Sequence, residues 1–317
     1  MGEATGLLLG LLAASVWGTQ DVLVAFAGRK VGGIVSAIGI VGTSMVLVFA
    51  LGLVAGVGPP SDPGIVLLAI AQGAISAVGF ACFYTALRLG PISVVSPTAA
   101  VYGGLSSLLA VIFLGERPGP VQVAGAIAAT IGIAFVGFQV AAGSSRPKLT
   151  GPGVPFAIGA LVAWSTSTVV LAVAISESSW LSVVEVARPA NLLLLVGVFL
   201  VVRWRGGRSD DLPPLPVEPE PVIDVEAQRG MAPGLSARLS AHPYRLLVIG
   251  GFFETVGYAA FTIGLQIAPT WLVALASSLG PMVTVAAGVL LFGERPRPVQ
   301  WVGIALVFSG IALVAIG

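Results

Sequence analysis

The chain has 317 residues, a mean hydropathy of +1.02 and only 9% charged side chains. Soluble domains carry roughly 25% charged residues, so this composition excludes an ordinary water-soluble protein and indicates an integral membrane protein. The 15 basic and 14 acidic residues nearly cancel, which argues against a nucleic-acid partner. Cys82 and His242 are the only residues of their kinds, so we expect no disulfide framework, no metal site and no cofactor.

Charged and turn-forming residues divide the chain into apolar segments, each long enough for a helix to cross a bilayer, which requires about 20 residues. Pro269 divides the long uncharged stretch 255–293, because proline lacks an amide N–H and disfavours helix before it. The apolar runs are continuous rather than alternating, which predicts helices and not a β-barrel. We therefore expect an all-α polytopic membrane protein with ten transmembrane helices, at residues 5–27, 31–61, 64–87, 92–114, 121–139, 152–175, 181–202, 246–265, 270–292 and 298–316.

Basic residues are divided unequally between the two sides of this arrangement. The loops after odd-numbered helices contain thirteen Lys and Arg residues, whereas the other loops contain only Arg117. Loops rich in Lys and Arg stay in the cytoplasm, so we expect both termini outside the cell and the protein in the cytoplasmic membrane. Residues 203–245, the longest polar segment, are rich in proline and balance six arginines against six acids, which is typical of a disordered surface loop.

A repeated motif relates the two halves of the chain. Residues 115–122, Gly-Glu-Arg-Pro-Gly-Pro-Val-Gln, return as residues 293–300, Gly-Glu-Arg-Pro-Arg-Pro-Val-Gln, at an offset of 178 residues. A weaker match at an offset of 147 pairs Trp17 with Trp164. Five helices per copy is an odd number, so the second copy would enter from the opposite face, as in the inverted repeats of alternating-access transporters. We expect a first repeat at 1–140, a linker at 141–151 and a second repeat at 152–317, interrupted by the polar loop.

Two five-helix copies that each close with Gly-Glu-Arg-Pro and a glycine-spaced helix resemble the EamA repeat of the drug/metabolite transporter superfamily. Trp17-Gly18 and the run Ser93-Val94-Val95-Ser96-Pro97 fit the same pattern. The resemblance covers nearly the whole chain apart from 203–245. It implies a ten-helix carrier, often an exporter of amino acids, nucleobases, sugars or toxic compounds, and in many members cytoplasmic termini.

Ionisable residues inside the predicted spans are the first candidates for a site, because each costs at least about 2.5 kcal/mol to insert and usually faces a partner or a water-filled cavity. Glu185, Arg188 and Asn191 share one helix face. Either Glu185 and Arg188 form an ion pair that holds helices together, or they line a cavity in which Arg188 binds an anionic group of the solute.

Glu254 has no opposite charge within one helical turn and shares a face with Tyr258 and Phe261. We interpret Glu254 as a proton-coupling or cation-binding site. The alternatives are a neutral acid hydrogen bonded between helices, or an acid paired with Arg188 across the bundle.

Trp17, Gln20 and Asp21 share a face of the first helix. Aromatic side chains at that depth can stack on a flat or cationic ligand, although packing or anchoring at the membrane interface is the alternative. Together with Tyr102 in the fourth span, the predicted substrate-binding residues are Trp17, Gln20, Asp21, Tyr102, Trp164, Glu185, Arg188, Asn191 and Tyr258.

Two further motifs are assigned structural roles. Glu116-Arg117 and Glu294-Arg295 are expected to cap helix ends at the membrane edge rather than to bind substrate. The glycine pairs Gly125/Gly132 and Gly303/Gly310 are expected to permit close helix contact. They could also form a dimer face, so we expect a monomer or a homodimer.

These features favour a secondary active transporter of a small metabolite or drug-like solute, exporting and coupled to protons. A lipid-intermediate flippase of the same architecture is the alternative. An intramembrane enzyme is disfavoured, because the spans contain no His–acid or Cys–His pair. No Walker A motif is present, so ATP-driven transport would need another chain. The expected partners are the solute and the lipid bilayer.

Overall fold

The computed structural model describes residues 2–89, 98–137, 153–204, 242–283, 286 and 298–317, and this part of the chain contains helices and turns but no strand. The helices α1, α2, α3, α5 and α6 cover Gly2–Val31, Gly33–Ala55, Pro63–Leu89, Tyr102–Phe113 and Pro120–Gly137. The helices α7, α8, α11, α12 and α14 cover Val154–Ser176, Trp180–Trp204, Pro243–Ile267, Thr270–Ser277 and Pro298–Ile316. The expected linker 141–151 and most of the polar loop 203–245 lie outside the described residues.

Length and hydropathy identify membrane spans among these helices. Within the described residues, six segments are long and apolar enough to cross a bilayer, in α2, α3, α7, α8, α11 and α14. Shorter apolar helices cover Thr98–Phe113, Pro120–Val136 and Thr270–Val283. Large apolar side chains such as Val54, Phe113 and Phe308 point outward and are mostly exposed, which suits a lipid environment and not water. The chain is therefore an integral, multi-pass membrane protein.

Proline and glycine positions account for many helix ends. Pro63, Pro120, Pro243 and Pro298 begin α3, α6, α11 and α14, where the missing amide N–H costs nothing. Helix α2 ends at Gly56, whose φ of 65° is the left-handed conformation that glycine adopts without strain. These signals explain why the predicted and observed ends of most helices agree closely.

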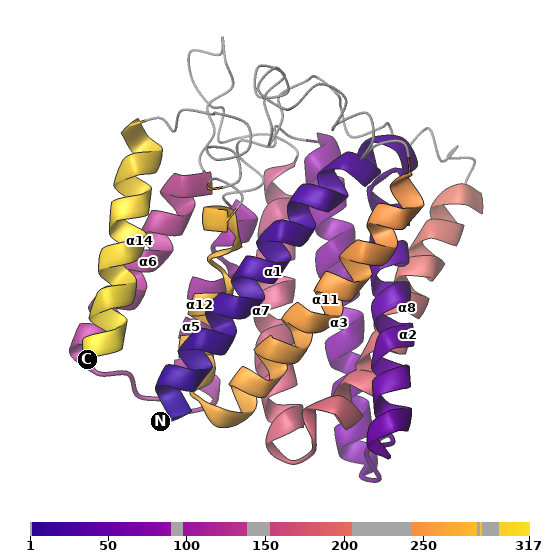
Figure 1. The fold of residues 1–317 in the computed structure, drawn as a ribbon, viewed down its shortest axis with the longest axis horizontal. Helices are drawn as coiled ribbons and strands as arrows, with labels where there is room; N and C mark the ends of the chain where they lie inside the picture. The colour runs from indigo at the N-terminus through magenta and orange to yellow at the C-terminus, as the bar shows by residue number, and fades with distance from the viewer. Residues whose placement is uncertain (1, 90–97, 138–152, 205–241, 284–285, 287–297) are drawn as a thin grey trace.

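Helix packing follows the sequence repeat. The offsets relate α1 to α7 and α3 to α11, and the structure packs α1 along α11 and α7 along α3. The indole of Trp17 lies against Gly257 in the first pair, and the indole of Trp164 lies against Gly79 in the second. Gly79 and Gly257 are themselves 178 residues apart. Helix α1 runs away from the end of the bundle that holds both termini, whereas α7 runs toward it (Figure 1).

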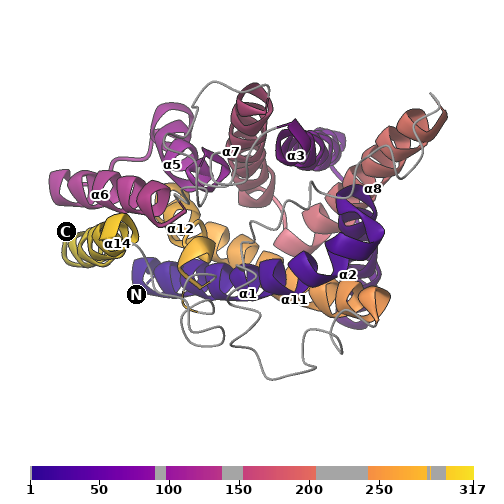
Figure 2. The same ribbon diagram turned by 90° about the horizontal axis from the view of Figure 1, so that it is seen from above.

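The helices α6 and α14 form a pair at one end of the bundle, beside α5 and α12 (Figure 2). Gly125 faces Gly310, and Gly132 faces Gly303; a Cβ atom added to Gly125 or Gly132 would lie 2.6 or 2.7 Å from the opposing carbonyl oxygen. The glycines therefore permit backbone contact within one chain, as predicted. Because this contact buries them, they cannot at the same time form the face of a homodimer.

Two helical segments are interrupted at positions that the repeat relates. Residues 98–100 are helical, Val101 forms a turn, and α5 then begins. In the second copy α12 ends before a turn at residues 278–279, and residues 280–283 are helical again. Val101 and Leu279 are 178 residues apart. Pro281 has no amide to bond the carbonyl of Ser277, which accounts for the second break. The expected spans 92–114 and 270–292 are therefore not continuous helices.

Candidate functional site

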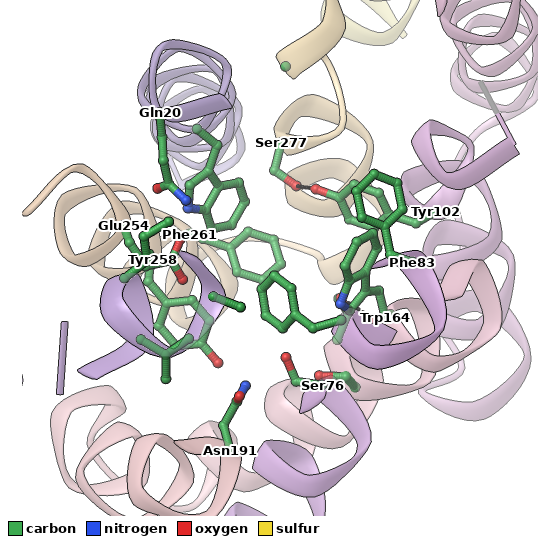
Figure 3. A pocket seen from close by; sticks show the side chains of 18 of the residues that line it. Gln20, Ser76, Phe83, Tyr102, Trp164, Asn191, Glu254, Tyr258, Phe261 and Ser277 are labelled. Atoms are coloured by element: carbon green, nitrogen blue, oxygen red, sulfur yellow. Dashed lines mark hydrogen bonds between the residues drawn. The ribbon is translucent and has the colours of Figure 1, made fainter. Parts of the chain in front are cut away.

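A cavity of about 290 Å³ lies between the two halves of the bundle. Side chains from α1, α2, α3, α5, α7, α8, α11 and α12 line it, and Figure 3 shows many of them pointing toward a shared space. The two helix interruptions border this space, since Ala100 and Tyr102 line it from one copy and Ser278 and Pro281 from the other. Irregular backbone at membrane depth is tolerated where it lines a cavity, so the breaks belong to the site.

An apolar core closes the cavity toward the end of the bundle that holds both termini. Each contributing helix supplies residues one to two turns from its cavity-lining residues, on the side of the termini. The buried members include Ala13, Ile65, Leu171, Val183, Leu265 and Val273. Because this core joins helices of both repeats, separating it would require the two halves to move apart. No described item of this core carries a charge, so water has no polar path through it.

Arg188 and Glu254 form the central ion pair of the cavity. The Nη2 atom of Arg188 donates to Oε1 of Glu254 at 2.8 Å, and both side chains are more than nine-tenths buried. The guanidinium also lies 3.8 Å from the ring centre of Tyr258, a cation–π contact. Helix α8 supplies Arg188 and helix α11 supplies the other two residues. The pair therefore fixes these two helices relative to each other.

Gln72 connects three helices through hydrogen bonds. Its amide Nε2 donates to the hydroxyl of Ser167 and to the hydroxyl of Tyr258, both at 2.9 Å. The side chain of Gln72 is 3% exposed, so these bonds form in an apolar surrounding where an unpaired amide would be costly. Gln72 thus holds the Tyr258 ring, and Tyr258 in turn supports Arg188. Sequence reasoning missed Gln72, although an amide in the middle of an apolar span is a recognisable signal.

Aromatic rings form the walls of the cavity. Trp17 packs on Phe261 with ring centres 5.5 Å apart. Trp164 contacts Phe80 and Phe83, each at 5.4 Å, and the more distant Tyr102 at 6.4 Å. The Tyr102 hydroxyl bonds the hydroxyl of Ser277 at 3.3 Å, which joins the two interrupted segments (Figure 3). These rings offer flat apolar surface at the edge of polar groups, a combination typical of small-molecule sites.

Several polar groups of the lining lack a partner within the described part of the chain. The buried atoms without a hydrogen bond are Nε1 of Trp17, Oε1 of Gln20, Nε of Arg188 and Oδ1 of Asn191. Buried polar atoms are normally satisfied by protein, water or ligand. All four belong to residues that line the cavity. Two donors and two acceptors therefore remain for water or a bound solute.

The structure gathers most of the predicted site residues into this one cavity. Its lining includes Trp17, Gln20, Asp21, Tyr102, Trp164, Arg188, Asn191, Glu254 and Tyr258. Their predicted roles in binding and coupling stay predictions. The lining also includes Ser76, Phe80, Phe83 and Ser277, which sequence analysis did not name, because apolar rings and hydroxyls are common in every span.

Glu185 is the exception among the predicted residues, because it does not belong to the cavity lining. Its carboxylate lies against Gly52 of α2, on the side of the apolar core. Arg188 pairs with Glu254 and not with Glu185, so the helical spacing of Glu185 and Arg188 pointed to the wrong partner. The side chain of Arg188 reaches toward α11, where a second acid is available.

Glu116 caps a helix of the other repeat. Its Oε1 accepts the backbone N–H of Thr270 at 2.6 Å, and its Oε2 accepts that of Trp271 at 2.9 Å. A carboxylate at a helix N-terminus satisfies free N–H groups and meets the positive end of the helix dipole. The prediction of a capping role is confirmed for Glu116, although the helix that it caps is α12. Glu294 and Arg295 lie outside the described residues.

The chain matches the EamA-like transporter family over residues 4–138 and 151–316. It belongs to this family. The two matched segments correspond to the two repeats, and EamA proteins are transporters of the drug/metabolite superfamily. No curated protein matches the sequence. One solved crystal structure, described only as that of a protein, is 19% identical, with a TM-score of 0.73, and covers 99% of this chain and 97% of that chain. At this identity, the likeness supports the EamA fold alone.

Proposed function

We propose that this EamA protein is a secondary active transporter that moves a small solute through the central cavity by alternating access. The proposed architecture has ten spans in two inverted repeats, with termini outside the cell, and the proposed direction is export. The cavity between the two halves carries this proposal. Its lining combines aromatic walls with unpartnered donors and acceptors, and an apolar core separates it from one end of the bundle.

The chemistry of the lining supports a small, largely apolar solute. A volume of about 290 Å³ is near the lower limit of small-molecule sites, which begin at about 300 Å³. Two related halves around such a cavity can open it first to one compartment and then to the other. Proton coupling is part of the proposal, with Glu254 as the residue that binds the proton.

Transport by the purified protein in proteoliposomes tests the proposal. A panel of radiolabelled amines, amino acids, nucleobases and sugars would be screened for counterflow, and we expect at least one to exchange across the membrane. Trp164→Phe and Trp164→Ala should reduce exchange progressively, because each removes aromatic surface from the wall. Trp301→Ala is the matched control, since Trp301 lies on α14 and is 56% exposed.

The assay also separates the transporter from a lipid flippase. Fluorescent phospholipid included in the same vesicles would report lipid movement between leaflets. Movement of lipid without exchange of any solute would contradict the proposed transporter. Equal effects of Trp164→Ala and Trp301→Ala on exchange would remove the cavity from the mechanism.

A further inference from the structure

We propose that the cavity selects organic monocations with a flat apolar body, and that Asp21 binds their positive charge. The inference rests on the proposed transport function and names the class of solute that the cavity accepts. It also assigns cation binding to Asp21 of α1 and not to Glu254 of α11.

The charge balance of the cavity is the first argument. Within the described residues, the charged members of the lining are Asp21, Arg188 and Glu254. Arg188 and Glu254 neutralise each other across 2.8 Å. Asp21 is exposed, and no hydrogen bond or ion pair joins it to another residue of the described part of the chain. The nearest charge acting on it is that of Glu254, which repels it. One uncompensated carboxylate therefore remains, and it favours a cation.

The state of Arg188 argues against an anionic or zwitterionic solute. Its Nη2 is bonded to Glu254, and the Tyr258 ring covers the guanidinium face at 3.8 Å. The unpartnered Nε atom is buried. A solute carboxylate would have to compete with Glu254 for this group and would also approach Asp21. Arg188 is thus part of the fixed wall, and its sequence-based role as an anion receptor gives way to a structural one.

Neighbouring groups on α1 complete a site for an amine. The buried Oε1 of Gln20, next to Asp21 in the chain, is an acceptor without a donor. An ammonium group carries several N–H donors and can bond a carboxylate and an amide oxygen together. Trp17 lies one helical turn before Asp21 on the same face and packs on Phe261. Aromatic faces attract cations and also cover flat apolar groups, so this wall accommodates both parts of the solute.

Binding to the purified full-length protein in detergent, measured by isothermal titration calorimetry, tests the proposal. The three probes share one phenyl ring: 2-phenylethylamine is a cation at neutral pH, 2-phenylethanol replaces the ammonium by a hydroxyl, and phenylalanine adds a carboxylate to the amine. We expect the amine to bind at least about tenfold more tightly than either of the others, because only it pairs with Asp21 without meeting a repelled group.

Substitution of Asp21 locates the charge that is responsible. Asp21→Asn keeps the shape of the side chain and should weaken binding of the amine at least about tenfold, with little change for the alcohol. Asp21→Glu should retain the preference for the amine. Asp62→Asn is the matched control, since Asp62 lies in the exposed turn before α3, and it should bind like the wild type.

The outcomes decide between the alternatives. If the wild type shows no preference for the amine, or Asp21→Asn keeps that preference, the inference is overturned. The comparison of probes on the wild type does not depend on the variant being stable. Because binding is measured without transport, proteoliposomes that move no solute would contradict the proposed function while a preference for the amine still supported this assignment.

Discussion

At the scale of single residues, the environment of a charged group decides its role. Asp21 and Glu254 are both acids in apolar helices and look alike in the sequence. The fold gives Glu254 a guanidinium partner and leaves Asp21 exposed in the cavity. Glu185 illustrates the same point, because a favourable helical spacing to Arg188 did not produce an ion pair. Contacts between helices determine which of these groups are paired.

Replacing Glu254 by Gln is predicted to destabilise the protein. The change leaves the charge of Arg188 buried without a counter-ion, which typically costs about 3–5 kcal/mol. Thermal unfolding in detergent measures this effect. The double variant Arg188→Gln/Glu254→Gln removes both charges and should recover much of the loss. Recovery that does not occur would mean that the ion pair is not the source of the instability.

The same variant tests proton coupling by Glu254. The titratable or charged groups that face it are Arg188 of α8, Tyr258 of α11, Asp21 of α1 and Tyr102 of α5. If Glu254 carries the coupled proton, uptake by Glu254→Gln should lose its dependence on pH, measured in proteoliposomes over a range of pH. An unchanged pH profile together with reduced stability would give Glu254 a purely structural role.

At the scale of helices, glycine and proline control how closely segments approach and where they break. The contact of α6 with α14 depends on glycines whose missing side chains let the backbones touch. The break after α12 coincides with Pro281, and the related break at Val101 occurs without proline. The cavity wall there is therefore similar in position in the two copies but different in origin.

Gly132→Ala is predicted to lower the thermal stability, because the new Cβ would lie 2.7 Å from the carbonyl oxygen of Gly303. Overpacking of this kind usually costs about 1–3 kcal/mol. Gly197→Ala in α8 is the control, since nothing lies within 4 Å of the added atom. It should raise stability by about 0.5–1 kcal/mol through helix propensity. Equal shifts of the unfolding midpoint in the two variants would contradict close packing of α6 on α14.

At the scale of the whole molecule, the apolar core closes the end that holds the termini, and the orientation in the membrane decides which compartment that is. The distribution of basic residues places this end outside the cell. The cavity would then be closed to the outside in the conformation described here. Its opening would require the core to separate along the boundary between the repeats.

Cysteine labelling in intact cells is expected to verify the orientation. In a Cys82→Ser background, Ser61→Cys lies at the end of the bundle with the termini, and His242→Cys lies at the other end; both positions are exposed. A membrane-impermeant maleimide should label Ser61→Cys in intact cells and His242→Cys only after the membrane is opened. The reverse pattern would place the termini in the cytoplasm.

The sequence by itself determined the class of protein, the spans and the repeat, because these depend on local hydropathy and on copied motifs such as Gly-Glu-Arg-Pro. It also singled out most of the charged and aromatic residues of the cavity, since polar groups in apolar helices are conspicuous. Only the tertiary structure decided that Arg188 pairs with Glu254, that Gln72 supports Tyr258 and that Glu116 caps α12. Each of these contacts joins residues far apart in the chain, and their partners depend on how helices are arranged in space.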